Sequence, residues 1–241
     1  EGLDVYLDWY DIEIENTIAA PTAQFLLTDC YVNSTLSSCA LITRNPASGD
    51  ILDMLALSAN NGALTQEGYD VTFAYRFDTS YGKFRVNWAS TYISEYITEI
   101  PLGSGPLSVV GNYFQFFPVW RLKSNIDLNW QYGDWGATFG ARYLSALDES
   151  CTSAVLAGVP EVCSDPDGTP TFGGPENEID DTWYFDIQGA WDTPWNGRIT
   201  AGINNLFDED PPIAYSAFAN SFDPQYELPG RFWYASYSQK F

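Results

Sequence analysis

The chain has 241 residues, 45% of them hydrophobic and 17% aromatic, so it can bury a sizeable core in one or two domains. Its 32 acidic residues against 10 basic ones give a net charge of -22, which argues against a nucleic-acid partner because such a partner requires a basic face. The absence of His excludes a serine triad and histidine-metal chemistry.

No run of 18 apolar residues occurs, so a membrane-spanning helix is not expected. The opening residues, E-G-L-D-V-Y-L-D-W-Y, show no basic region followed by an apolar one, and hence no targeting signal. Either a signal has been removed or the chain is a piece of something longer.

Apolar and polar residues alternate with a period of two in eight segments, which predicts eight β-strands. In chain order these are residues 3–14, 64–77, 84–92, 120–130, 135–144, 181–191, 198–204 and 230–241. Short turns such as D-T-S-Y-G and Q-Y-G-D join the second strand to the third, the fourth to the fifth and the sixth to the seventh. The sequence therefore predicts an all-β, antiparallel protein.

The connections alternate between these short turns and stretches of about 45, 20, 35 and 22 residues. Compact soluble domains rarely do this, since their median connection is roughly 4 to 6 residues. Transmembrane β-barrels do, with short periplasmic turns, long extracellular loops, and strands that are apolar outward and polar inward. The pattern indicates a transmembrane antiparallel β-barrel.

Aromatic residues fall into two belts when the chain end and the short turns are placed at the periplasm, as expected for membrane interfaces. One belt holds Tyr75, Phe84, Trp130, Trp135, Trp191, Trp195 and Phe241, and the other holds Trp9, Tyr92, Trp120, Trp183 and Trp233.

The four cysteines lie in two of the long connections, Cys30 with Cys39 and Cys151 with Cys163. Pairing within each connection is the simplest of three possible connectivities. A metal site would need short C-x-x-C spacing and usually His, which are both absent, so two disulfides formed in an oxidising compartment are favoured.

Residues 202–212, G-I-N-N-L-F-D-E-D-P-P, and the final Y-E-L-P-G-R-F-W-Y-A-S-Y-S-Q-K-F resemble the carboxyl-terminal signature of TonB-dependent outer-membrane receptors. The stretches V-Y-L-D-W-Y-D-I-E-I-E-N, I-T-R-N-P-A-S-G-D and N-G-A-L-T-Q-E-G-Y-D-V also resemble the distal barrel of these receptors. The resemblance spans nearly the whole chain.

This resemblance implies a 22-stranded barrel with an amino-terminal plug domain and a coupling box that touches TonB. Residues 1–241 would be the carboxyl-terminal portion of that barrel, without plug or coupling box. The implied function is active import of a scarce nutrient (siderophore, cobalamin, oligosaccharide or peptide) across the outer membrane of a Gram-negative bacterium, without an enzymatic step. The implied partners are the TonB complex, outer-membrane lipid, lipopolysaccharide and the nutrient; no cofactor is expected.

In each predicted strand, every second side chain is polar and would face the interior of the barrel. These side chains form either a polar wall that contacts the plug and water or, at the extracellular end, a ligand site. The ligand candidates are the outermost cations and the loop aromatics, namely Tyr113, Phe114, Phe116, Arg121, Arg142, Tyr215, Phe218 and Tyr226. Loop aromatics can stack on a ligand, but they can equally anchor a loop to itself. Asp165 and Asp167 offer oxygen ligands for calcium without matching the twelve-residue calcium loop, so solvated turns are the alternative.

Two other functions remain open. A self-contained eight-stranded barrel, acting as an adhesin or anchor, would pair the first strand with the last, whereas a receptor segment would leave both edges for strands from elsewhere because hydrocarbon does not tolerate open edges. A secreted sugar-binding β-sandwich would be soluble without detergent.

Overall fold

The computed structural model describes residues 2–99, 106–114, 117–167, 174–215, 217 and 222–240. The chain divides into two compact units: Glu1–Trp9, Gly68–Ser94 and Val110–Phe241 form the first, and Tyr10–Glu67 and Glu95–Val109 the second. No helix in the described part of the chain is long and apolar enough to cross a lipid bilayer.

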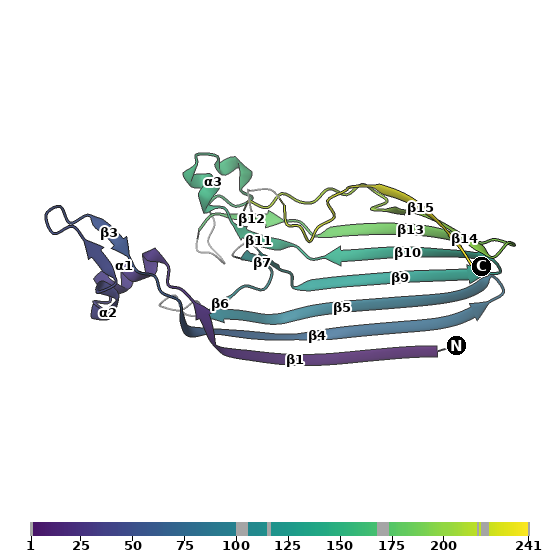
Figure 1. Cartoon of the computed structure of the whole chain (residues 1–241), viewed down its shortest axis with the longest axis horizontal. Coiled ribbons are helices and arrows are strands. Elements are labelled where there is room, and N and C mark those ends of the chain that lie inside the picture. The colour runs from purple at the N-terminus through teal and green to yellow at the C-terminus, as the bar shows by residue number, and fades with distance from the viewer. Residues whose placement is uncertain are drawn as a thin grey trace. The chain divides into compact units, whose positions relative to one another are not determined.

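One antiparallel sheet contains all eight strands predicted from the sequence (Figure 1). Its strand order follows the chain order, β1-β4-β5-β9-β10-β13-β14-β15, and a short strand, β6 (Pro106–Ser108), pairs with β5. The eight strands are β1 (Gly2–Ala19), β4 (Ala59–Thr79), β5 (Gly82–Glu99), β9 (Leu122–Tyr132), β10 (Trp135–Leu144), β13 (Thr182–Asp192), β14 (Gly197–Asn204) and β15 (Phe232–Gln239).

The predicted strand limits agree with the observed ones within a few residues, except at the ends of β1, β4 and β5, which are longer. Strand β10 occupies the predicted residues 135–144. The three longer strands extend into the second unit, past the residues in which apolar and polar side chains alternate clearly. A strand can continue there because its backbone hydrogen bonds do not depend on side-chain polarity.

Strands β1 and β15 lie at opposite ends of the strand order and do not pair with each other among the described residues. The sheet therefore does not close on itself as the eight-stranded-barrel alternative required. It is also a single long-stranded sheet rather than the two packed sheets of a sandwich.

The strand registers give this sheet one apolar and one polar face. An apolar row runs through six consecutive strands: Val86, Leu128, Phe139, Ile187, Ile203 and Trp233 are successive cross-strand partners. A polar row runs beside it through Arg85, Asn129, Thr138, Gln188, Gly202 and Tyr234. The polar row is hydrogen-bonded within itself, since Thr138 Oγ1 donates to Asn129 Oδ1 at 3.0 Å and Tyr234 OH donates to Gln188 Oε1 at 3.0 Å.

Most of the described aromatic residues predicted to form belts are exposed, as the prediction requires, and Phe241 lies outside the described residues. Near the short turns, Trp135 stacks on Trp191 at 5.7 Å between ring centres, and Trp191 meets Trp195 edge-on at 5.7 Å. At the other end, the side chains of Trp9, Trp183 and Trp233 are 58%, 43% and 69% exposed. The assignment of Trp120 to a belt is wrong, because this side chain is only 2% exposed and packs among the long connections.

Three of the long connections are folded rather than irregular. In the first unit, β7 (Asn112–Phe114), β8 (Phe117–Val119), β11 (Leu147–Ser150) and β12 (Glu176–Ile179) form a four-stranded sheet, in which β11 and β7 are parallel. A helix, α3 (Thr152–Leu156), and a 3-10 turn, η1 (Pro160–Val162), lie between β11 and β12. The Cys151–Cys163 disulfide closes this α3–η1 segment.

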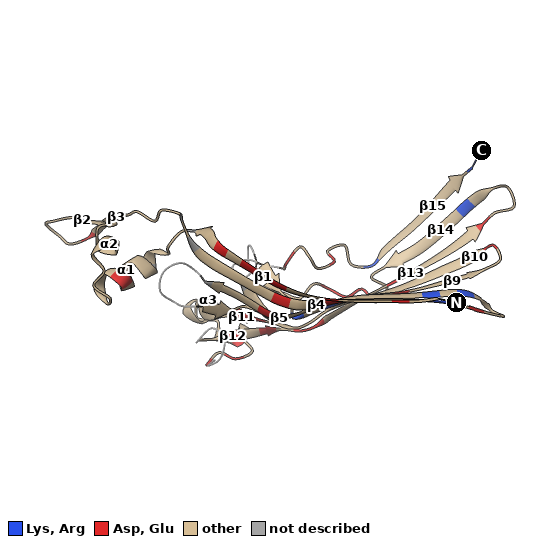
Figure 2. Cartoon of the chain, turned by 90° about the horizontal axis from the view of Figure 1, so that it is seen from below, with Lys and Arg blue, Asp and Glu red and all other residues tan. Residues whose placement is uncertain are grey.

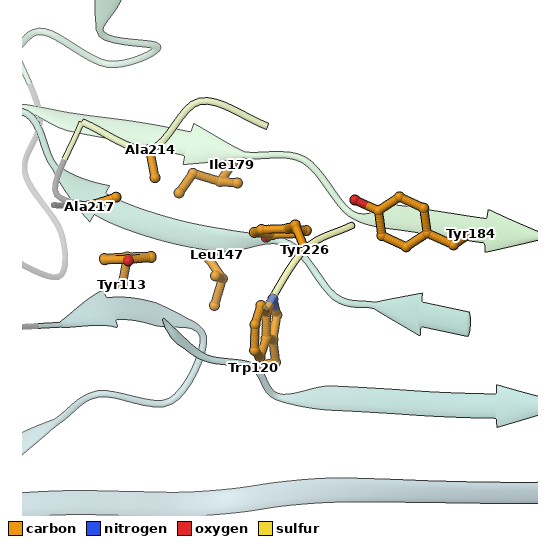
Figure 3. Packing of buried hydrophobic residues seen from close by; sticks show 8 residues of the cluster. All are labelled: Tyr113, Trp120, Leu147, Ile179, Tyr184, Ala214, Ala217 and Tyr226. Carbon is orange, nitrogen blue, oxygen red and sulfur yellow. The ribbon is translucent and has the colours of Figure 1, made fainter. Parts of the chain in front are cut away.

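Most of the main buried cluster of the first unit lies among these connections, and one member, Tyr184, comes from the long strand β13 (Figure 3). We call it the loop cluster; it consists of Tyr113, Trp120, Leu147, Ile179, Tyr184, Ala214, Ala217 and Tyr226. Trp120 and Tyr226 meet edge-on at 5.6 Å between ring centres. The apolar face of the main sheet, by contrast, stays exposed: Phe139 is 38% and Ile187 42% accessible.

The second unit contains a small subdomain between β1 and β4. It is built from α1 (Ala23–Tyr31), α2 (Leu36–Cys39) and a hairpin of β2 (Ile42–Arg44) and β3 (Ile51–Met54). Thr22 caps α1 by accepting a hydrogen bond from Phe25 N, and the Cys30–Cys39 disulfide joins α1 to α2. Both disulfides thus have the pairing predicted from the sequence.

Candidate ligand-binding site

Arg142 lies on the polar face of β10 and binds two carboxylates. Its guanidinium forms an ion pair with Glu227 and a second one with Asp186, at 3.5 Å. The guanidinium carbon also lies 5.4 Å from the centre of the Tyr184 ring. Because Glu227 belongs to the connection between β14 and β15, this ion pair ties that connection to the polar face of the sheet.

A second set of contacts holds the same connection in place. Tyr113 OH donates to Asp223 Oδ2 at 2.8 Å, and Tyr215 N donates to Glu149 Oε1 at 2.9 Å. The side chains of Tyr113 and Asp223 are each 3% exposed and that of Glu149 is fully buried. We call the described residues 213–215, 217 and 222–227 the strap, since polar contacts fasten them to β7, β10 and β11.

Burial and the nearby carboxylates also affect the tyrosines of this region. Burial, followed by the hydrogen bond to Asp223, raises the pKa of Tyr113 well above its ordinary value. Burial raises the pKa of Tyr226 to about 12. Both hydroxyls therefore stay protonated at neutral pH, and Tyr113 acts as a hydrogen-bond donor to the strap.

The structure brings three of the predicted ligand residues together. Tyr113 and Tyr226 belong to the loop cluster, and Arg142 adjoins it through Tyr184. The two tyrosines are buried and anchor the connections to one another, which is the alternative left open for loop aromatics. Contact between these residues and a ligand stays a prediction.

The other predicted residues are more scattered. Arg121 is exposed just before β9, Tyr215 is half-buried in the strap, and Phe114 is the last residue of β7. Phe116 and Phe218 lie outside the described residues. Asp165 and Asp167, the calcium candidates, are exposed, and the described residues contain no group of three or more His, Cys, Asp or Glu side chains placed to hold a metal.

Two hollows open on the polar face. The larger, of about 680 Å³, lies near the short turns and is lined by both signs of charge. Its charged residues are Arg76, Asp78, Lys83, Arg85, Asp127, Asp192 and Arg198. Two of these cations already have acidic partners, since Arg76 pairs with Asp4 at 3.1 Å and Arg198 with Asp192 at 3.0 Å.

The smaller hollow, of about 400 Å³, adjoins the loop cluster. It is lined from four strands of the sheet, by Trp120 ahead of β9, and by Gln225 from the strap. Of the residues around this hollow, sequence reasoning selected Arg142. It missed Tyr184, Gln225 and Glu227, because nothing in their local sequence shows that the strap folds back onto β10 and β13.

Long antiparallel strands, opposed apolar and polar faces, and short turns alternating with folded connections are the features of a β-barrel wall. A family model described as TonB dependent receptor-like, beta-barrel matches residues 1–206. The chain belongs to the TonB-dependent receptor family, whose members are transporters and not enzymes.

Solved structures of such receptors share this fold. A mutant of the ferric enterobactin receptor PfeA from Pseudomonas aeruginosa, in complex with enterobactin, is similar with a TM-score of 0.59 and 13% identity. The siderophore receptor PirA from Acinetobacter baumannii gives 0.56 and 16%, and the copper transporter OprC gives 0.55 and 14%. In each case 98% of this chain is covered but only 28% or 29% of the other chain, so this chain spans less than a third of their length. A search of curated proteins gave no match.

Proposed function

We propose that residues 1–241 form the carboxyl-terminal part of the barrel wall of a TonB-dependent importer in the outer membrane of a Gram-negative bacterium. The observation that carries this proposal is the continuous apolar row from Val86 to Trp233 across six strands, backed by a continuous polar row. Hydrocarbon can accept the first row, and an aqueous interior can accept the second.

The two edges of the sheet support the same proposal. Neither β1 nor β15 has a second partner among the described strands, and unpaired backbone groups cannot face hydrocarbon. In the complete receptor, further strands pair with both edges and close a wider barrel. A plug domain fills its interior and contacts the TonB complex, while lipid and lipopolysaccharide surround the outside.

The cargo in this proposal is a scarce nutrient, of the kind represented by siderophores, cobalamin, oligosaccharides or peptides. The ferric enterobactin and siderophore receptors among the similar structures favour an iron chelate, and the copper transporter favours a metal cargo more generally. The outer connections would capture the cargo, and TonB, driven by the inner-membrane proton gradient, would open the plug.

Uptake by cells that produce the full-length receptor tests this proposal. Cells with the receptor gene deleted are compared with complemented cells for accumulation of ⁵⁵Fe-siderophores, radiolabelled copper, cobalamin, oligosaccharides and peptides. We expect that deletion of the gene abolishes the uptake of one of these cargoes. A protonophore, which collapses the proton gradient, should abolish the uptake of the same cargo in complemented cells. The proposal would be refuted if deletion left the uptake of every probe unchanged and the complemented cells contained no receptor in their outer-membrane fraction.

A further inference from the structure

The N-L-F-D-E segment that follows β14, residues 205–209, forms a turn at the start of the connection to β15. The ladder between β13 and β14 ends at the pair Ile187–Ile203, although β13 itself extends to Thr182. Asn205 begins the turn with φ at 51°, in the left-handed region that Asn tolerates better than most residues. Strand β14 therefore stops short of the end of its neighbour, and the chain continues as the connection that contains the strap.

The side chain of Asn205 holds this turn together. Its amide nitrogen donates to Glu209 O at 2.8 Å, and its Oδ1 accepts from Glu209 N at 2.8 Å. The Asn205 carbonyl also accepts from Asp208 N at 3.0 Å. Asn205 is 0% exposed, so water does not compete for these bonds. Because Asn is the shortest side chain that carries a donor and an acceptor side by side, it suits this position.

The same turn joins the two ends of the connection. Asp208 Oδ1 accepts from Arg231 N at 2.6 Å, and Arg231 Nε donates to Leu206 O at 2.9 Å. Figure 2 shows how sparsely Lys and Arg occur compared with Asp and Glu, 10 against 32, and yet both Arg231 and Arg142 bind this connection. The connection is thus a loop closed at its base by the turn.

A chain of polar contacts leads from the turn to the strap. Asn205 N donates to Asp186 Oδ1 at 2.8 Å. The other oxygen of this carboxylate, Asp186 Oδ2, forms the ion pair with Arg142 at 3.5 Å, and Arg142 forms its second ion pair with Glu227 of the strap. One carboxylate therefore binds the turn with one oxygen and the strap's cation with the other.

We propose that Asn205 is a positioning residue: the turn that its side chain holds orients Asp186 and, through it, the Arg142 guanidinium that receives Glu227. This role explains why the strap, whose sequence carries no signal for it, lies on the polar face of β10. The use of this arrangement in transport rests on the proposed importer function, in which the polar face lines the path of the cargo. The positioning itself depends only on contacts within the first unit.

Hydrogen exchange of the amides of residues 222–227, in the full-length receptor purified in detergent, tests this proposal. Asn205→Gly removes the side-chain bonds but tolerates the positive φ, and it should raise these exchange rates about five- to tenfold. Glu227→Gln, which removes the ion pair at the strap itself, should raise them to a similar extent. The exchange rates of β9 and β10 should stay unchanged in both variants, since these strands pair along their full length.

The double variant gives the decisive measurement. If Asn205 acts through Asp186 and Arg142, Asn205→Gly should change the rates of residues 222–227 less than about twofold once Glu227→Gln has broken the link. An equal increase in both backgrounds, or no increase in Asn205→Gly alone, overturns the proposal. If Asn205→Gly does not reach the outer membrane, Asn205→Asp replaces it, because Asp also tolerates positive φ and keeps an acceptor for Glu209 N.

Asn204→Gly is the matched control. It makes the same replacement at the neighbouring residue, whose side chain has no hydrogen bond in the part of the chain that the structure describes. It should leave the exchange of residues 222–227 unchanged, and an increase as large as that in Asn205→Gly also overturns the proposal. These measurements need no cargo, so the positioning role and the importer function succeed or fail independently.

Discussion

At the scale of single residues, the contact between Tyr113 and Asp223 decides how firmly the strap is held. The two residues are 110 positions apart in the chain, and both are 3% exposed. Removing the donor leaves a buried carboxylate with one hydrogen bond fewer, although Gln225 N still donates to its other oxygen at 2.8 Å.

Tyr113→Phe is therefore expected to destabilise the strap by about 1 to 3 kcal/mol, the usual cost of leaving a buried polar group unsatisfied. Hydrogen exchange of the backbone amides of residues 222–227 measures this, and the rates should rise. Tyr81→Phe, at a residue that is 79% exposed, serves as the control and should change nothing. Unaltered exchange in Tyr113→Phe would mean that the hydrogen bond between Tyr113 and Asp223 does not hold the strap.

Asp148 is a residue whose charge opposes the fold. Its pKa is raised, first by burial and then by repulsion from Glu176 and Glu178, and Glu178 is its direct cross-strand partner. Because the folded state binds this proton more readily than the unfolded state, lowering the pH towards the raised pKa relieves a destabilisation that is fully present at neutral pH.

Asp148→Asn should accordingly stabilise the β11–β12 pair by about 0.2 to 1 kcal/mol at pH 7, since like charges directly opposite each other are destabilising. The gain should shrink as the pH falls through the raised pKa of Asp148. Limited proteolysis of the connection between β10 and β13 measures this gain. At pH 7 the variant should be cleaved more slowly than the wild type, and at pH 4.5 this difference should be smaller. A gain of equal size at both values would contradict the electrostatic cause.

At the scale of elements, each disulfide closes one folded connection. The Cys151–Cys163 pair is separated by 12 residues, and Cys30–Cys39 by 9, with each pair inside a different unit. Alkylation of the unreduced protein should find no free thiol at these four positions.

Replacing Cys151 and Cys163 by Ser should destabilise the α3–η1 segment by about 2 to 3 kcal/mol, the value expected for closing a loop of this length. Hydrogen exchange should accelerate in residues 152–163, while β9 and β10, which pair along their full length, should keep their rates. The matched double variant of Cys30 and Cys39 should affect only α1 and α2. Faster hydrogen exchange throughout the long strands would show that the stability of the sheet depends on the folded connections.

At the scale of the whole molecule, the parity of the strands is the property on which membrane insertion depends. Phe139 lies in the apolar row, and its neighbour Thr138 lies in the polar row. Phe139→Arg places a charge towards hydrocarbon and should cost about 2 to 4 kcal/mol, as for lipid-facing positions near mid-membrane.

Thr138→Arg is the paired control and should be much milder, at about 1 kcal/mol for the lost hydrogen bond to Asn129. Urea unfolding of the full-length receptor in lipid vesicles gives both values. The same comparison can be repeated with Ile187 and Gln188. Equal costs at the two parities would show that the apolar row does not face lipid.

The open edges of the sheet concern the molecule as a whole as well. Residues 1–241 expressed alone are expected to aggregate, because β1 and β15 would each present an unpaired edge. Sedimentation after refolding into detergent should show large, heterogeneous species. A closed monomer with heat-modifiable mobility would contradict this expectation and favour pairing of β1 with β15.

Much of the main sheet could be predicted from the sequence, because alternation with a period of two is a local property. The limits of β10 and β14 follow from ten or fewer consecutive residues and their turns, and the disulfides follow from cysteines a few positions apart. The short strands β7, β8, β11 and β12 were not predicted, since segments of three or four residues carry too little alternation to be recognised.

The sequence by itself determined the eight long strands, which of their side chains lie on the apolar and on the polar face, and the family. Each of these depends on neighbours along the chain or on motifs such as G-I-N-N-L-F-D. Only the tertiary structure decided that Trp120 is buried rather than in a belt, and that Tyr113 and Tyr226 anchor connections. It also decided that Lys123 faces a hollow beside Arg142. These outcomes depend on contacts such as Arg142 with Glu227, 85 residues apart, whose free energy exists only after the strap has folded back onto the sheet.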